Sequence, residues 1–308
     1  MKKLPFMLVD AFAERAMTGN PAGIVFCDTP LSDAQMRAMA REVNASETSF
    51  LTDIQPDGSA TLRWFTPRVE MDFCGHATVA AAHALYARSR ASNRGDGQLS
   101  YRFSTRSGVL PVTGEIAGDA TADAPLWWLE MPVPKLEPAR VNALKLANVL
   151  GCALDDFDTS IPMLKTRAGV LIVFVSSWQI LANLRPNFGA LAEWCFENQL
   201  RDVGVSTTKT LSPMIHASSR FFAPVCGIDE DPVTGTLHGP LCRILAEHNL
   251  APHHEGIYAM NCLQGIPDGR GGKVVGLVDT RESELRVKIA GKCWVSIEGE
   301  ICVPEEGV

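Results

Sequence analysis

Residues 63–67 have the sequence Arg-Trp-Phe-Thr-Pro, and residues 220–224 repeat it as Arg-Phe-Phe-Ala-Pro, 157 positions later in a chain of 308 residues. Each copy has the aromatic composition of a β-strand and leads into an acidic loop that contains glycine. A run of small and apolar residues typical of a buried helix follows each loop. Internal similarity at this spacing predicts two similar halves, each with a strand, a loop and a helix start.

Outside the repeat, strand-like runs outnumber helical ones. Examples are FMLVDAF at residues 6–12 and GVLIVFV at 169–175, both rich in apolar and β-branched residues. The clearest amphipathic helix spans LSDAQMRAMAREVN at 31–44, with Ser32 as its N-cap and its end near Asn44. Few helices are expected between the other strands, so the pattern predicts an α+β protein.

Composition and charge exclude several classes of function. The chain is 46% hydrophobic and carries a net charge of −7 without any run of Lys or Arg, which argues against a nucleic-acid partner. Asp10 interrupts the apolar N-terminal run, and no apolar segment of about 18 residues follows, so we expect no membrane partner and a cytoplasmic location. The nine cysteines form no CxxC pair, so neither a disulfide framework nor a zinc pattern is indicated.

The two helix starts suggest the kind of ligand. The first N–H groups of a helix lack intrahelical partners and lie at the positive end of its dipole, so they bind carboxylates well. If the halves face each other, both helix starts flank one cleft suited to a small anionic substrate. At the ungapped offset of 157 residues Cys74 corresponds to Asp231, so the repeat pairs no thiol with a thiol and racemisation by two thiols is disfavoured.

No cofactor or metal is expected from the motifs. The segment EHNLAPHHE at 247–255 contains histidines, but Pro252 lies within it and no pair of histidines has the i, i+4 spacing of a helical metal site. A solvated loop is the better interpretation. The sequence has neither a GxxxxGK[ST] loop nor a GxGxxG turn that opens a helix.

Four stretches carry a resemblance to a known family. They are TGNPAGIV at 18–25, NASETSF at 44–50, FTPRVEMDFCGHAT at 65–78 and RFFAPVCGIDEDPVTGTLHGPL at 220–241. Because they occur in family order and span both halves, the chain resembles the PhzF-like (phenazine biosynthesis protein) family, which has the diaminopimelate-epimerase-like fold.

The resemblance implies a fold and an assembly. It implies two pseudo-symmetric domains, each a curled, barrel-like mixed β-sheet around a central helix, with the site between them. We expect the domains at residues 1–130 and 131–295, with a last strand near 296–308 that returns to the first domain. A homodimer is implied by the resemblance alone.

The resemblance also implies a reaction, that of a cofactor-independent isomerase typified by the enzyme that converts trans-2,3-dihydro-3-hydroxyanthranilate. A group that removes a proton from one carbon and returns it to another suffices for this reaction, and a carboxylate in a dry cleft meets that need. The implied catalytic residues are Glu47 as general acid and base, His76 and Asp231. The implied substrate-binding residues, which would contact a small carboxylate, are Asn20, Gly75, Gly235 and Thr236.

Two alternatives remain open. One is an amino-acid epimerase or racemase that uses Cys74, whose place beside a helix start favours the thiolate, together with a partner that is not a thiol. The other is a small-ligand-binding protein that has kept the cleft and lost turnover. The presence of Glu47, His76 and Asp231 together argues against the second alternative.

Overall fold

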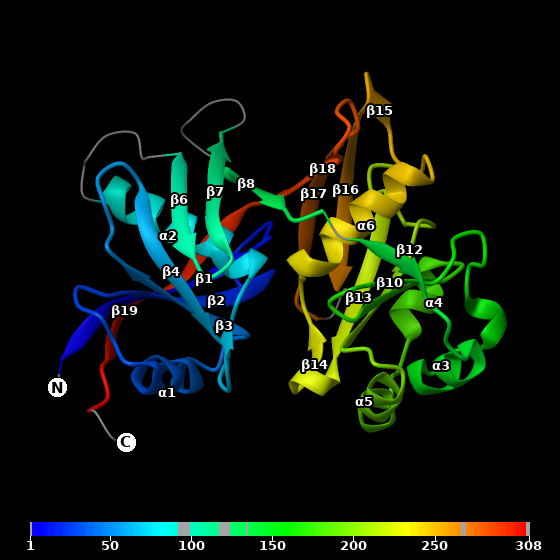
Figure 1. The fold of residues 1–308 in the computed structure, drawn as a ribbon, viewed down its shortest axis with the longest axis horizontal. Helices are drawn as coiled ribbons and strands as arrows, with labels where there is room; N and C mark the ends of the chain where they lie inside the picture. The colour runs from blue at the N-terminus through cyan, green and yellow to red at the C-terminus, as the bar shows by residue number, and fades with distance from the viewer. Residues whose placement is uncertain (1, 92–98, 117–123, 134, 266–268, 306–308) are drawn as a thin grey trace. The chain divides into compact units, whose positions relative to one another are not determined.

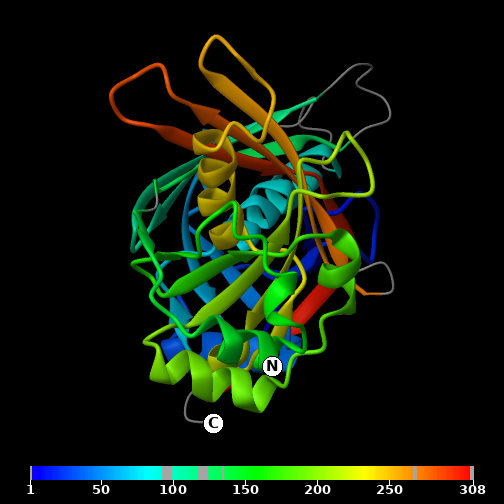
Figure 2. The same cartoon turned by 90° about the vertical axis from the view of Figure 1, so that its right-hand side faces the viewer.

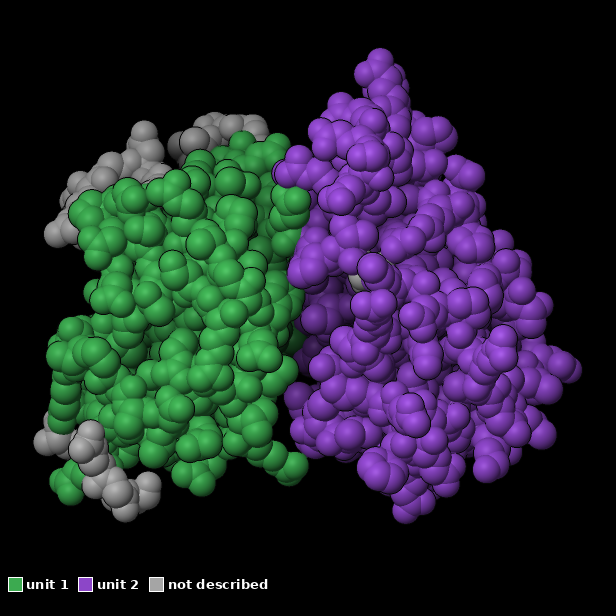
Figure 3. All heavy atoms as spheres, viewed as in Figure 1, with its two compact units in different colours: residues 1–130, 290–308 green, residues 131–289 purple. Residues whose placement is uncertain are grey.

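The computed structural model of the chain describes residues 2–91, 99–116, 124–133, 135–265 and 269–305. The chain divides into two compact units, residues 1–130 with 290–308 and residues 131–289, coloured green and purple in Figure 3. None of the helices in the described part of the chain combines the length and the apolarity needed to cross a membrane.

In its described residues the first unit is a mixed sheet with two helices (Figure 1). Its strands follow one another in space as β19, β1, β2, β3, β4, β6, β7 and β8, with the β2–β3 and β4–β6 pairs parallel and the others antiparallel. The elements are β1 (Lys3–Ala11), β2 (Asn20–Phe26), α1 (Asp33–Val43), β3 (Glu47–Thr52), β4 (Ser59–Phe65), β5 (Glu70–Met71), α2 (Gly75–Ala91), β6 (Ser100–Thr105), β7 (Gly108–Glu115), β8 (Leu126–Met131) and β19 (Cys293–Cys302).

The predicted mixed fold is confirmed, but the expected barrel-like closure is not present. Among the described residues no pairing joins β8 to β19, so the sheet of the first unit stays open. The last strand, β19, pairs antiparallel with β1 from Lys3↔Cys302 to Ala11↔Cys293. Residues 306–308, the end of the segment expected to return to the first half, lie outside the described residues.

The central helix of the first unit is α2. Every residue from Gly75 to Tyr86 is buried, and the helix contacts β1, β2, β3, β7 and β19 (Figure 1). Its run of alanines has high helix propensity and no polar face, and a helix that is apolar all round is buried on all sides. Small side chains let the strands approach this helix closely, which holds its first residues in place.

The helix α1 begins and ends where the sequence predicts. Ser32 and Gln35 form a capping box, in which the Gln35 N–H donates to Ser32 Oγ at 3.3 Å and the Ser32 N–H donates to Gln35 Oε1 at 3.0 Å. The helix ends at Asn44, which has a left-handed φ of 51°. Asn44 turns the chain so that Glu47, three residues later, opens β3.

The second unit repeats this topology. The order β9, β10, β11, β12, β13, β16, β17 contains parallel pairs β11–β12 and β13–β16, matching β2–β3 and β4–β6. The elements are β9 (Leu136–Pro138), α3 (Ala143–Leu150), η1 (Leu154–Asp156), β10 (Leu164–Thr166), β11 (Val170–Phe174), α4 (Trp178–Asn183), α5 (Phe188–Glu197), β12 (Asp202–Thr207), β13 (Ala217–Ala223), η2 (Pro224–Cys226), β14 (Ile228–Asp231), α6 (Gly235–Glu247), β15 (His253–His254), β16 (Ile257–Gly265), β17 (Gly271–Asp279) and β18 (Arg286–Gly291). The helix α6 contacts β11, β16 and β17 and corresponds to α2 (Figure 2).

The repeated pentapeptides hold equivalent contacts in the two units. Arg63 donates Nε and Nη2 to the two carboxylate oxygens of Glu70, both at 2.7 Å. Arg220 donates the same two nitrogens to Glu230, at 2.8 and 2.7 Å. The predicted internal repeat is therefore confirmed, down to a bidentate arginine–glutamate pair in each half.

The helices between β9 and β12 correct the expectation of few helices. The helices α3 and α5 pack against each other and bury Leu146, Leu191 and Trp194 in one apolar cluster. Both have N-cap side chains, Asn142 for α3 and Asn187 for α5, whose oxygens accept from the N–H three residues on. The two asparagines are the sequence features that indicate a helix start. The segments that follow them are too short to show a clear amphipathic period, so the sequence alone did not predict these helices.

Candidate active site

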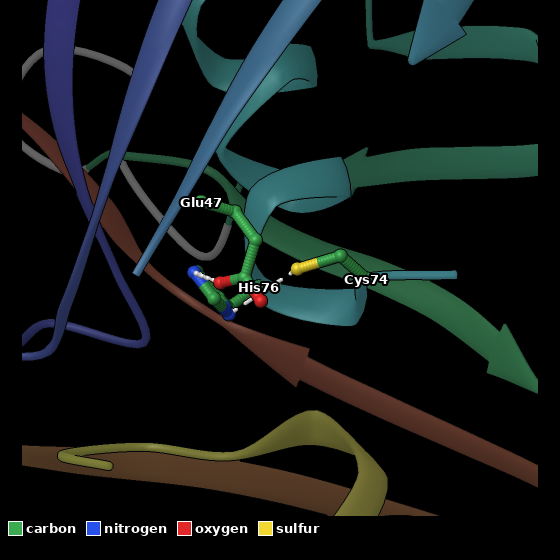
Figure 4. A group of neighbouring side chains, drawn as sticks. All are labelled: Glu47, Cys74 and His76. Atoms are coloured by element: carbon green, nitrogen blue, oxygen red, sulfur yellow. Dashed lines mark hydrogen bonds and ion pairs between the residues drawn. The ribbon is translucent and has the colours of Figure 1, made fainter. Parts of the chain in front are cut away.

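Glu47, Cys74 and His76 meet in the first unit (Figure 4). Glu47 is the first residue of β3 and pairs in register with Ala22 of β2. Cys74 directly precedes α2, and His76 is the second residue of that helix. One donor atom from each of the three side chains lies within 4.8 Å of the others.

The imidazole of His76 lies at the centre of this group. Its Nε2 lies 3.2 Å from Oε2 of Glu47, a contact as short as a hydrogen bond but without the alignment of one. Its Nδ1 lies 3.5 Å from the Cys74 sulfur and 3.4 Å from Nδ2 of Asn20. Asn20 is fully buried, and its Oδ1 accepts a hydrogen bond from the Ser46 hydroxyl at 3.2 Å.

His76 is neutral near physiological pH. Burial lowers the pKa of its imidazole from 6.5 to about 3, because the charged form would lose its hydration. Its position at the positive end of the α2 dipole also disfavours a second proton on the ring. The contact between His76 and Glu47 therefore joins a neutral ring to a carboxyl group and is not an ion pair.

The start of α2 adds backbone donors to the site. Helix geometry leaves the N–H groups of Gly75, His76 and Ala77 without an acceptor inside the helix. The first intrahelical acceptor is the Cys74 carbonyl, which takes the Thr78 N–H at 3.2 Å and the Thr78 hydroxyl at 2.5 Å. Donors at a helix start next to a buried carboxyl group suit a substrate that itself carries a carboxylate.

Glu47, Cys74 and His76 also offer the oxygen, sulfur and nitrogen ligands that zinc accepts. Their arrangement fits a metal poorly, because His76 turns Nε2 toward Glu47 and Nδ1 toward Cys74, on different edges of the ring. One ion cannot use both contacts, and the positive helix end opposes a cation. The geometry fits the passage of protons better than the binding of a metal.

Asp231, Gly235 and Thr236 lie in the second unit. Asp231 ends β14, and its Oδ2 accepts a hydrogen bond from the Thr234 hydroxyl at 2.5 Å. Gly235 and Thr236 begin α6, with Thr234 as the N-cap residue. The Thr234 hydroxyl donates to Asp231, and its side chain makes no cap hydrogen bond to the first N–H groups of the helix.

Gln264 completes this second group, and the sequence does not predict it. Its Nε2 donates to the Asp231 carbonyl at 2.7 Å and to Thr234 Oγ1 at 3.0 Å, and its Oε1 accepts the Thr234 N–H at 2.9 Å. Gln264 is buried in β16, more than thirty positions along the chain from Asp231. The sequence shows only a polar residue, Gln264, within an apolar strand, and this does not indicate which residues it bonds to.

The predicted site residues thus form two groups, each within its own unit. Glu47, His76, Asn20 and Gly75 come together at the start of α2, with Cys74 beside them. Asp231, Gly235 and Thr236 come together at the start of α6. The histidines of the 247–255 segment lie elsewhere, with His253 and His254 exposed in β15.

The repeated mixed sheets around two buried helices define the diaminopimelate-epimerase-like fold. The chain belongs to the phenazine biosynthesis-like (PhzF) protein family, whose family model matches residues 9–299. It is 31% identical over 309 residues to the uncharacterized isomerase CA_C3446 of Clostridium acetobutylicum, an alignment that covers 98% of this chain and 99% of that protein.

Solved structures give the same result. The PhzF-family phenazine biosynthesis protein of Bacillus anthracis matches with a TM-score of 0.85 and 26% identity, over 98% of this chain and 100% of that one. A hydroxyproline epimerase of Agrobacterium vitis matches with a TM-score of 0.60 and 10% identity, over 99% and 94% of the two chains. The second likeness shows a shared fold and no more.

Proposed function

We propose that the protein is a cofactor-independent isomerase that moves a proton between two carbons of a small carboxylate, with Glu47 as the general acid and base. One observation carries the proposal: Oε2 of Glu47 lies 3.2 Å from Nε2 of a neutral, buried histidine at a helix start. A carboxylate shielded from water can take a proton from carbon and return it elsewhere on the same substrate.

The surrounding groups divide the remaining tasks. A neutral His76 does not compete for the proton and can donate its own N–H to the carboxylate of Glu47. Negative charge that develops on the substrate carboxylate would be stabilised by the N–H groups at the start of α2. The sequence repeat supports Asp231, Gly235 and Thr236 as further substrate contacts, because they hold the matching helix start of the second unit.

The substrate class follows from the donors and from the family. We propose a small cyclic or amino-acid-like carboxylate, with trans-2,3-dihydro-3-hydroxyanthranilate as the first compound to test. The helix-start donors would bind its carboxylate. Asp231 would suit an amino group, because a carboxylate pairs with an ammonium.

The test compares wild type, Glu47→Gln and Glu42→Gln in heavy water, with substrate loss and deuterium uptake followed by NMR. Glu42 lies on the exposed side of α1 and serves as the matched control. We expect turnover with deuterium incorporation in wild type and in Glu42→Gln, and none in Glu47→Gln. Equal turnover in all three would remove Glu47 as the base, and tight binding without turnover in wild type would favour a binding protein.

An epimerase that uses Cys74 is the second candidate, favoured by the 3.5 Å contact between its sulfur and His76. This candidate predicts exchange of an amino-acid α-proton with solvent. The exchange would be lost in Cys74→Ala and would survive in Glu47→Gln, which is the opposite pattern to that of the first proposal.

A further inference from the structure

We infer that Asn20 and Cys74 are positioning residues that fix the tautomer of His76, so that its Nε2 carries the proton that faces Glu47. This inference deepens the proposed function and rests on it for the catalytic consequence. The tautomer itself is a property of the resting protein and can be measured without substrate.

The contacts of Nδ1 determine the tautomer. Nδ1 lies 3.4 Å from the amide nitrogen of Asn20 and 3.5 Å from the thiol of Cys74. An amide nitrogen only donates, so Nδ1 is the acceptor of the Asn20 contact, and the Cys74 thiol can donate to it as well. A neutral imidazole has one donor and one acceptor nitrogen. The proton of the ring therefore sits on Nε2, on the side of Glu47.

The Asn20 amide has a partner at each end. The Ser46 hydroxyl donates to Asn20 Oδ1 at 3.2 Å, and the amide nitrogen lies toward His76. Gly19 fixes the backbone before it, with φ of +67° and only 2.2 Å between an added Cβ and the Ala11 carbonyl oxygen. A flipped amide would present oxygen to Nδ1 and would favour the opposite tautomer.

Cys74 is held in place by its own backbone. Its carbonyl accepts both the N–H and the hydroxyl of Thr78, so the residue is attached to the first turn of α2. The thiol then lies beside Nδ1 as a second donor. This role requires a protonated sulfur and needs no thiol in the second unit, which accounts for a cysteine at a helix start that has no counterpart there.

The opposite tautomer would damage the site. With the proton on Nδ1, the lone pair of Nε2 would face the carboxylate of Glu47 across 3.2 Å, and two acceptors would repel. Glu47 would then face a lone pair instead of an N–H across this contact. Wrong tautomers of catalytic histidines lower kcat strongly while substrate binding remains, so kcat should fall with little change in KM.

The decisive measurement is the ¹⁵N NMR spectrum of histidine-labelled protein, with His76→Gln used to assign the ring signals. We expect a protonated Nε2 and an unprotonated Nδ1 in the wild type at neutral pH. Asn20→Asp replaces the donor with an acceptor of the same size and should shift the ring toward the Nδ1–H tautomer, with kcat lowered by roughly 100-fold. Asn148→Asp, on the exposed face of α3, is the matched control.

The thiol is tested separately. Cys74→Ser keeps a donor and should keep the Nε2–H tautomer, whereas Cys74→Ala removes one of two donors and should increase the Nδ1–H population. A protonated Nδ1 in the wild type overturns the inference, as does an Asn20→Asp spectrum identical to that of the wild type. If Asn20→Asp does not fold, the wild-type spectrum and the Cys74 pair still decide. If the tautomer is as expected but no substrate turns over, the proposed function fails and the inference about the ring stands.

Discussion

Glu47 and Asp202 occupy the same position in the two units. Each is the first residue of the strand that runs parallel to its predecessor, Glu47 beside Ala22 and Asp202 beside Val170. The surroundings of the two carboxyl groups differ. Glu47 faces an imidazole, whereas Asp202 binds Arg201 Nε at 2.7 Å and accepts from the Cys226 thiol at 3.7 Å. The fold therefore places an acid in both units and surrounds only Glu47 with groups suited to proton transfer.

We therefore expect Asp202→Asn to keep activity while it changes the pH dependence of stability. Burial raises the pKa of Asp202 above its usual 3.8, more than Arg201 lowers it. Above pH 3.8 the folded protein then binds more protons at this site than the unfolded chain, so the free energy of unfolding falls as pH rises through the folded pKa. Asp202→Asn has no carboxyl group to ionise at this position, so its free energy of unfolding does not show this decrease.

The measurement is urea unfolding of wild type and Asp202→Asn between about pH 4 and 7. The difference in unfolding free energy should move in favour of the variant as pH rises. An unchanged difference across this range, or a loss of turnover comparable to that of Glu47→Gln, would contradict the assignment of Asp202 as a structural residue.

The repeat was predictable from the sequence, but its register was not. The pentapeptides are 157 residues apart, whereas the helix starts Gly75 and Gly235 are 160 residues apart. Loops of unequal length cause the difference, so Cys74 corresponds in the structure to Thr234 and not to Asp231. The conclusion that the second unit has no cysteine at the position that corresponds to Cys74 survives the correction.

The group around His76 was predictable only in part. The motifs name Glu47 and His76, and the resemblance assigns them one site. Nothing in the spacing of residues 20, 46 and 76 indicates that Ser46 bonds to Asn20 or that Asn20 contacts the ring, because these contacts depend on side-chain geometry across three separate segments of the chain. For the same reason the sequence could not show that His76 is buried deeply enough to stay neutral.

Buried histidines should make the protein sensitive to acid. Burial lowers the pKa values of His83 and His238 from 6.5 to about 4, as it lowers that of His76 to about 3. Below pH 6.5 the unfolded chain binds protons that the folded protein excludes, so the free energy of unfolding decreases as pH falls from 6.5 toward 4.

The variant His83→Gln tests this prediction at a histidine outside the proposed active site. Glutamine is a suitable replacement, because Trp127 Nε1 donates to His83 Nδ1 at 3.2 Å and the glutamine amide oxygen can accept the same hydrogen bond. Unfolding of the variant near pH 5 should take up roughly one proton fewer than that of the wild type. His254→Gln is the control, because the side chain of His254 is exposed. Equal proton uptake by wild type and His83→Gln would refute the prediction.

The two repeated arginines should contribute unequally to stability. Arg220 is 4% exposed and, besides Glu230, donates to the carbonyls of Leu181 and Leu184 at 3.3 and 2.9 Å. Arg220→Met should lower the free energy of unfolding by roughly 3 kcal/mol, because these acceptors lose a buried donor. Arg63→Met should cost about 1 kcal/mol, since Glu70 keeps Arg106 at 2.7 Å. Denaturant titration of both variants measures these changes. Equal decreases in the free energy of unfolding would contradict the prediction that Arg220 contributes more than Arg63.

Gly19, which directly precedes Asn20, should be needed for activity. A Cβ at this position would lie 2.2 Å from the Ala11 carbonyl oxygen, and φ is +67°. Gly19→Ala must therefore move the backbone next to Asn20, and we expect a loss of at least about 2 kcal/mol in stability together with a lower kcat. Gly108→Ala is the matched control, because φ is +98° there and no atom lies within 4 Å of the added Cβ. It should cost about 1 kcal/mol and leave kcat unchanged. Full activity of Gly19→Ala would show that the position of Asn20 does not control the site.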